Sequence, residues 1–175
     1  MKFALQEMTK DEIDTIKNRV EDNSRQIDEI VAGIIQPYCK DLDKYVEFIR
    51  GCLKDGENPP TTPELEDWCM NLSTYIYFAS GMCENLGVRD DIAKAVYKEM
   101  YNASRNSLEK GTVADKDAHA AIYSQQEAVI SAAYTRAYKT MKAKVESAQE
   151  LLQSAKKVLS HRIQEEELAN FNGGR

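Results

Sequence analysis

Apolar residues near the N-terminus recur at alternating steps of three and four positions, which is the spacing of one face of an α-helix. Thr9 and Glu12 form the pattern of a capping box, which predicts that this helix begins beside them. Every first heptad position is β-branched, and Asn23 is the single polar residue in the stripe, a pattern typical of a coiled coil. The stripe consists of Ile13, Ile16, Val20, Ile27, Ile30 and Ile34.

Gly33 and Pro37 interrupt this stripe and predict a kink or a break in the helix. The apolar pattern then resumes over residues 38–52. Residues 55–62, with one Gly, two Pro and two Thr, predict a loop and the clearest boundary in the chain. Thr62 as the N-cap and Pro63 as the first helical residue should start the next helix.

Three helical stretches follow. The first has apolar residues on one face between 65 and 82, and Gly87 should end it. The second runs from about 88 to 109, with apolar positions Ile92, Ala95, Val96, Met100 and Ala103. After a break at 110–112, nothing stops a helix from 115 to 169, which would span about 80 Å. Its apolar stripe is Met141, Val145, Ala148, Leu152, Ala155 and Leu159.

These patterns predict an all-α protein, an elongated helical bundle or hairpin with a long C-terminal helix and a coiled-coil-like N-terminal helix. Residues 1–57 would form acidic amphipathic helices with a kink near 33–37, and residues 58–175 the helical core. The long helix should pack on the stretches between 62 and 109 and on the N-terminal helix, because its apolar stripe needs cover.

Composition suits a folded helical protein, since 42% of the residues are hydrophobic and 30% are charged. Cys39, Cys52, Cys69 and Cys83 contain no CxxC pair and lie within helical apolar patterns, so we expect reduced, buried thiols. Residues 1–10 lack the apolar segment of a signal peptide, and no run reaches 18 apolar residues. We therefore expect a cytoplasmic protein, in the host cytoplasm if a phage encodes it, that does not enter a membrane.

The sequence contains none of the common motifs for catalysis, metal binding or phosphate binding. His161 and Glu165 lie four positions apart and could hold a metal ion, but a surface ion pair fits that spacing better. No nucleophile has a base at a recognisable spacing. We therefore expect no enzyme, no catalytic residue, no metal site and no cofactor.

The N-terminal stripe has two interpretations, which the sequence leaves open. It packs against later helices of the same chain, or it joins several copies into a homo-oligomer. In the second case, isoleucine at both core heptad positions favours trimers or tetramers over dimers, and Asn23 would set the register.

The net charge of −6 is unevenly placed. Residues 1–67 carry 16 acidic and nine basic residues, whereas residues 128–162 carry seven basic and two acidic residues. Within the basic stretch, Arg136, Lys139 and Lys142 lie near one helix face, with Tyr134 and Tyr138 nearby. Such a face is either simply solvated or binds nucleic acid, with cations on phosphates and rings stacked on bases.

Three motifs follow one another in the C-terminal half of the chain. They are Tyr97 and Tyr101 on one helix, the loop at 114–117, and a Leu-x-x-Ala-Lys-x-Val-Leu-Ser-x-Arg pattern over residues 152–162. With these motifs, residues 70–170 resemble the UvsY-like recombination mediators of bacteriophages. The resemblance implies a ring-like homo-oligomer that binds single-stranded DNA and helps a RecA-type recombinase to displace single-strand-binding protein. Besides Arg136, the cations placed at the DNA are Arg105, Lys110, Lys139, Lys142, Lys156 and Lys157.

We therefore expect an oligomeric, single-stranded-DNA-binding mediator that assists a RecA-type recombinase. The alternative is a non-enzymatic coiled-coil structural or adaptor protein that binds a protein partner, such as a virion component or an inhibitor of a host protein. In that alternative the acidic N-terminal face would dock a basic partner through Asp11, Asp14, Glu21, Asp22, Asp28 and Glu29.

Overall fold

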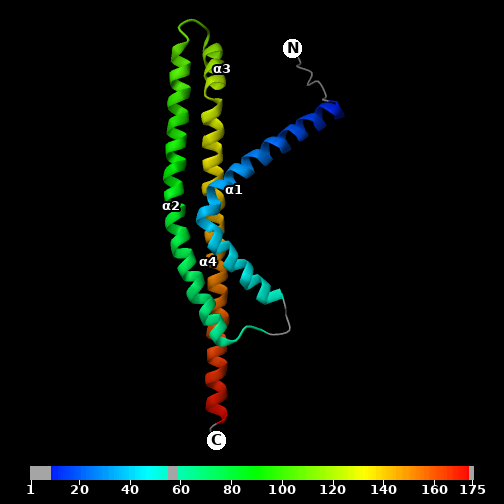
Figure 1. The fold of residues 1–175 in the computed structure, drawn as a ribbon, viewed down its shortest axis with the longest axis vertical. Coiled ribbons are helices and arrows are strands. Elements are labelled where there is room, and N and C mark those ends of the chain that lie inside the picture. The colour runs from blue at the N-terminus through cyan, green and yellow to red at the C-terminus, as the bar shows by residue number, and fades with distance from the viewer. Residues whose placement is uncertain (1–8, 55–58, 174–175) are drawn as a thin grey trace, which may run out of the picture.

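The computed structural model describes residues 9–54 and 59–173, which form four α-helices and no strand (Figure 1). α1 spans Lys10–Lys54, α2 spans Thr62–Ser107, α3 spans Val113–Tyr123 and α4 spans Gln125–Gly173. The predicted all-α fold is therefore confirmed. Within the described residues, no helix combines the length and the apolar character that crossing a membrane requires.

α2 and α4 form a long antiparallel hairpin that contains most of the core (Figure 1). Leu72 on α2 and Met141 on α4 are both fully buried. Ala137 and Ala148 of α4 are also buried. Their short side chains let α2 and α4 approach closely. The buried or half-buried residues of α4 keep the predicted steps of three and four, so this stripe forms the inner face of the hairpin.

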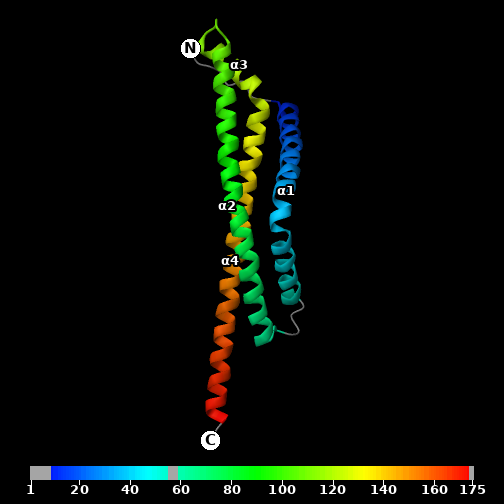
Figure 2. The ribbon, with the colours of Figure 1, turned by 60° about the vertical axis from the view of Figure 1, so that its left-hand side comes forward.

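The C-terminal half of α1 packs along the hairpin and runs opposite to α2 (Figure 2). Ile49 of α1 is only 1% exposed. The Lys144 ammonium group on α4 donates hydrogen bonds to both carboxylate oxygens of Asp43, at 2.7 and 2.8 Å. The rings of Tyr45 on α1 and Tyr75 on α2 lie 5.2 Å apart, centroid to centroid. The apolar pattern predicted over residues 38–52 therefore faces the core.

The N-terminal half of α1 leaves the hairpin. Residues 10–30, which we call the arm, extend away from α2 and α4 from the arm's last turn, where Ile27 is still half-buried against the core (Figure 1). The helix is continuous through Gly33 and Pro37, so the interruption predicted there is a bend and not a break. Proline cannot donate a hydrogen bond to the carbonyl four residues earlier and its ring crowds that carbonyl, which accounts for the bend.

The observed caps follow the predicted ones with one shift. Glu12 N donates to Thr9 Oγ1 at 3.3 Å, and Thr9 N donates to the Glu12 carboxylate at 2.8 Å, so the predicted capping box is confirmed. α2 is capped by Thr61 and not by Thr62, because Thr61 forms its own capping box with Glu64. That reciprocal pair satisfies two backbone amides, which makes Thr61 the better cap.

The prediction that Gly87 ends a helix is wrong, because α2 continues to Ser107. A Cβ atom at residue 87 would lie 3.2 Å from Cε2 of Tyr138, so glycine lets this α4 ring pack closely against α2. The break predicted at 110–112 is confirmed: Thr112 caps α3, and Gly111 has a φ of +149°, which residues with side chains rarely adopt.

The single helix predicted from 115 to 169 is divided in two at Ser124. The buried Ser124 hydroxyl donates to the carbonyl of Ala120 at 2.8 Å, and such a local bond competes with regular helix geometry. The division is confined to one residue, because backbone hydrogen bonds of 3.0 Å still enter and leave Ser124. α3 and α4 therefore lie nearly end to end (Figure 1).

The four cysteines are free thiols, and three of them are buried: Cys39, Cys69 and Cys83. Burial raises the pKa of the Cys39 thiol to about 11, and the hydrogen bond that the thiol donates to Asp43 contributes to this rise. These thiols therefore act as apolar core side chains, as the sequence predicts.

Candidate binding surfaces

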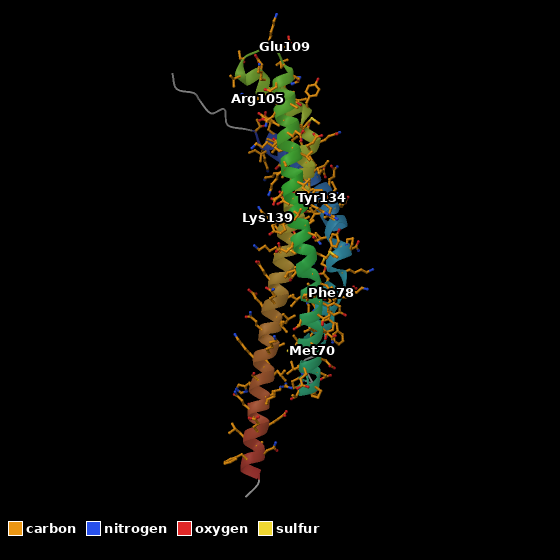
Figure 3. The ribbon with its side chains drawn as sticks, turned by 90° about the vertical axis from the view of Figure 1, so that its left-hand side faces the viewer. Met70, Phe78, Arg105, Glu109, Tyr134 and Lys139 are labelled. Carbon is orange, nitrogen blue, oxygen red and sulfur yellow. The ribbon has the colours of Figure 1, made fainter. Side chains whose placement is uncertain are left out.

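The seven cations predicted to bind nucleic acid do not form one patch. Arg105 and Lys110 lie at the end of the hairpin where α2 turns toward α3 (Figure 3 labels Arg105). Lys156 and Lys157 lie about 25 Å along α4 from Lys139, at 1.5 Å per residue. One DNA segment of a few nucleotides cannot contact all of them.

Two of these cations are paired with carboxylates. Arg105 Nε donates to Asp117 Oδ1 at 2.6 Å, and the Tyr101 hydroxyl lies 3.4 Å from the same oxygen. Lys142 Nζ lies 4.0 Å from Glu146 on the next turn of α4. Both pairs reduce the positive charge that these side chains offer to a phosphate.

Arg136 and Lys139 of α4 join Tyr97 of α2 in lining one shallow hollow, which we call the basic face. Both cations are exposed, and Tyr97 is half-buried with its ring 6.2 Å from that of Tyr101. Among the described residues, no carboxylate lies within 4.0 Å of either cation. Figure 3 shows Lys139 on the edge of the hairpin away from the C-terminal half of α1 and Tyr134 on the edge toward it.

The aromatic ring of the basic face differs from the predicted ones. Tyr138 packs against Gly87, and Tyr134 lies on the side toward α1, so neither ring lies beside the two cations. The ring beside the two cations is that of Tyr97, which lies on α2 and is distant from them in sequence. Its spacing of one turn from Tyr101 was visible in the sequence, but its nearness to α4 was not.

Asp90 of α2 is a buried carboxylate that bridges the hairpin beside the basic face. It accepts hydrogen bonds from Thr135 Oγ1 on α4 at 2.5 Å and from Lys94 Nζ at 2.7 Å. Burial by itself would raise the pKa of Asp90, but these two hydrogen bonds outweigh it and hold the pKa below its usual value. The charged carboxylate therefore links α2 to α4.

The N-terminal stripe is divided between buried and exposed residues. Ile27 in the last turn of the arm and Ile34 beyond it are half-buried against the core. The side chain of Asn23 lies outside the described residues, as do residues 1–8 and the part of the predicted loop at 55–58. The remaining four residues are between 40% and 61% exposed: Ile13, Ile16, Val20 and Ile30. The arm of a single chain thus presents an apolar stripe to solvent.

A second exposed apolar surface lies on the hairpin, beyond the point where α1 leaves it. Ile92 and Val96 of α2 are 57% and 48% exposed, and Ile130 of α4 is 52% exposed. These apolar positions of α2 do not form its buried face, because α4 packs on the neighbouring stripe that contains Asp90. They line a groove, which we call the open groove, with Arg89, Ala93, Glu127 and Tyr134.

A third surface, which we call the aromatic patch, consists of Met70, Tyr77 and Phe78 on the first half of α2 (Figure 3). Their exposed fractions are 70%, 76% and 65%. The rings of Tyr77 and Phe78 meet edge to face, with centroids 5.5 Å apart. Grouped exposed apolar residues of this kind mark surfaces that bind partners more often than isolated ones do.

The remaining surface includes the pair His161 and Glu165, which the sequence offered as a possible metal site. His161 Nδ1 lies 3.3 Å from Glu165 Oε1, and both side chains are exposed, as predicted for a surface pair. Within residues 9–54 and 59–173, no group of three or more possible metal ligands occurs.

A scan against protein-family models, a search of curated proteins and a search of solved structures each gave no match. Function is therefore inferred from the surfaces of this chain.

Proposed function

We propose that this protein is an oligomeric recombination mediator that binds single-stranded DNA through the basic face. The observation that carries the proposal is that Arg136, Lys139 and Tyr97 line one hollow. Two cations beside an aromatic ring suit binding that is indifferent to base sequence, because the cations pair with phosphates and the ring stacks on a base.

The position of the basic face supports the proposal. It lies on the side of the hairpin away from the C-terminal half of α1, and no residue of α1 lines it (Figure 3). It also lies within residues 128–162, where seven basic residues stand against two acidic ones. Since some neighbouring cations are already paired, we expect about two to four phosphate contacts and an affinity near the micromolar range.

Fluorescence anisotropy with a labelled strand of about 40 nucleotides tests this function. Two to four phosphate contacts predict that affinity falls roughly 7- to 50-fold between about 50 and 200 mM salt. The double variant with Arg136→Glu and Lys139→Glu should not bind the strand, because two attractive charges become repulsive.

The matched control changes Lys156→Glu and Lys157→Glu, an equal change of charge on the same helix about 25 Å away. This control should keep most of the affinity. Equal losses for both double variants would mean that overall charge, and not the basic face, attracts the DNA. A wild-type chain that fails to bind at low salt would disprove the DNA-binding function.

The second candidate function is that of a non-enzymatic adaptor for another protein, and the aromatic patch favours it. Tyr77 and Phe78 are bulky and well exposed, which suits an interface anchor. Changing Tyr77→Asp and Phe78→Asp separates the two candidates. An adaptor would lose a protein that co-purifies with the wild type, whereas a DNA mediator would keep its affinity for the strand.

A further inference from the structure

We infer that the arm of one chain packs into the open groove of a second copy, whose own arm returns the contact. This inference concerns assembly and does not depend on DNA binding. Its basis is that the departure of α1 from the hairpin leaves two apolar surfaces exposed, one on the arm and one on the hairpin.

The open groove lies on the side of the hairpin that α1 already occupies. Val96 stands three heptads after Tyr75, whose ring packs against Tyr45 of α1. Ile130 stands two heptads before Lys144, which binds a carboxylate of α1. Residues at one heptad position share a side of the helix in a coiled coil, so the open groove continues the surface that α1 covers.

The junction between the covered and uncovered parts is at Arg89. Its guanidinium donates to the Tyr38 hydroxyl of α1 at 3.0 Å and lies 6.0 Å from the centre of that ring. Arg89 and Ile92 line both the hollow beside Tyr38 and the open groove. The two hollows therefore adjoin, and Tyr38 of α1 lines only the first of them.

The arm carries the matching face. Ile13 and Val20 occupy the same heptad position as Ile27 and Ile34, which pack against the core of their own chain. The exposed stripe of the arm thus adjoins the face with which α1 already contacts the hairpin, where Val31 and Ile35 are buried beside Ile27 and Ile34. The open groove, which adjoins the surface that α1 covers, can therefore accept the exposed part of the stripe.

Length and charge agree with this docking. The arm, residues 10–30, spans about 30 Å, and α2 from 89 to 107 spans about 27 Å. The arm carries seven acidic and four basic residues. Residues 88–107 and 125–144 together carry eight basic and four acidic residues, of which Arg136 and Lys139 belong to the basic face on the other side of the hairpin. Net charges of opposite sign therefore attract the arm to this end of the hairpin, whereas the groove lining itself holds one charge of each sign, Arg89 and Glu127.

A second copy is the occupant that satisfies both surfaces at once. The bend near Pro37 turns the arm away from the groove of its own chain (Figure 1). Each chain therefore offers one arm and one groove. Two chains related by a two-fold axis bury both pairs in one closed, self-complementary interface.

Sedimentation equilibrium of the purified full chain, from about 1 to 100 µM, tests the inference, and we expect a dimer. Ile16→Asp in the arm and Val96→Asp in the groove should each weaken the dimer by about a hundredfold or more, because each buries a charge in the contact. Both side chains are about half exposed in the single chain, so helicity should be unchanged. Leu168→Asp, at an exposed apolar position of α4 outside the groove and the arm, is the matched control and should leave the dimer intact.

Mixing the two variants distinguishes this docking from a coiled coil of two arms. Together, Ile16→Asp and Val96→Asp chains should form a mixed dimer, because one intact arm meets one intact groove. If the arms paired with each other, Val96→Asp would remain dimeric by itself and mixing would restore nothing. That result, or a wild-type chain that stays monomeric throughout, would overturn the inference.

Discussion

Thr135 joins the two long helices through the buried carboxylate of Asp90, and its replacement by valine isolates that one interaction. Valine has nearly the shape of threonine but no hydroxyl, so Thr135→Val removes the 2.5 Å hydrogen bond. Lys94 would still donate to the other carboxylate oxygen. Because the Lys94 side chain is 51% exposed, however, water screens that contact and limits how far it can compensate.

The size of the effect follows from the burial of Asp90. A hydrogen bond to a charged group contributes about 1.5–3 kcal/mol, and the Asp90 side chain is only 5% exposed, so water cannot easily replace the lost donor. We expect Thr135→Val to lower the free energy of unfolding by about 2 kcal/mol at pH 7. Thr74→Val is the matched control. The exposed Thr74 hydroxyl bonds its own helix at Met70, so this change should stay within about 0.5 kcal/mol.

Urea denaturation at pH 7 and in acid measures both variants at one protein concentration. The folded-state pKa of Asp90 is lowered, so its stabilisation is present above the unfolded pKa of about 4 and is lost as pH falls through the folded pKa. In acid the carboxyl is protonated, and the penalty of Thr135→Val should shrink to about 1 kcal/mol or less. A penalty under about 0.5 kcal/mol at pH 7, or one that grows toward acid, would refute this reasoning.

Two further predictions concern the core. Leu72→Ala should lower the free energy of unfolding by about 2–5 kcal/mol, whereas Met70→Ala, on the exposed side of α2, should change it by less than about 0.5 kcal/mol in the same urea titration. Because the pKa of Cys39 is about 11, roughly one thiol in a thousand is ionised at pH 8. Cys39 should therefore react with a thiol reagent far more slowly than the half-buried Cys52, and equal rates by mass spectrometry would contradict the burial of Cys39.

The local features of this fold could be predicted from the sequence because neighbouring residues produce them. The capping box at Thr9 and the break at Gly111 depend on hydrogen bonds and backbone angles within a few residues. The inner face of α4 is visible as a spacing of three and four, since any helix places those positions on one side. The all-α class follows from the same local signals.

The cations of the basic face were also visible in the sequence, but their grouping was not. Arg136 and Lys139 are close in the chain, whereas Tyr97 reaches them only because α2 lies beside α4. Among the seven predicted cations, distance along α4 separates Lys156 and Lys157 from this hollow, and an ion pair engages Arg105. Composition alone does not distinguish a free cation from a paired one.

Tertiary structure decided which face of a helix is buried and where a helix ends, wherever the local sequence allowed two outcomes. Residues 88–107 carry one stripe with Ile92 and Val96 and another with Asp90, and hydrophobicity alone would bury the first. The structure buries the second, because Thr135 on α4 supplies a hydrogen bond that makes a buried carboxylate tolerable. Gly87 likewise continues a helix because a ring 51 residues away packs against it. These outcomes depend on contacts between distant segments, which local periodicity cannot encode.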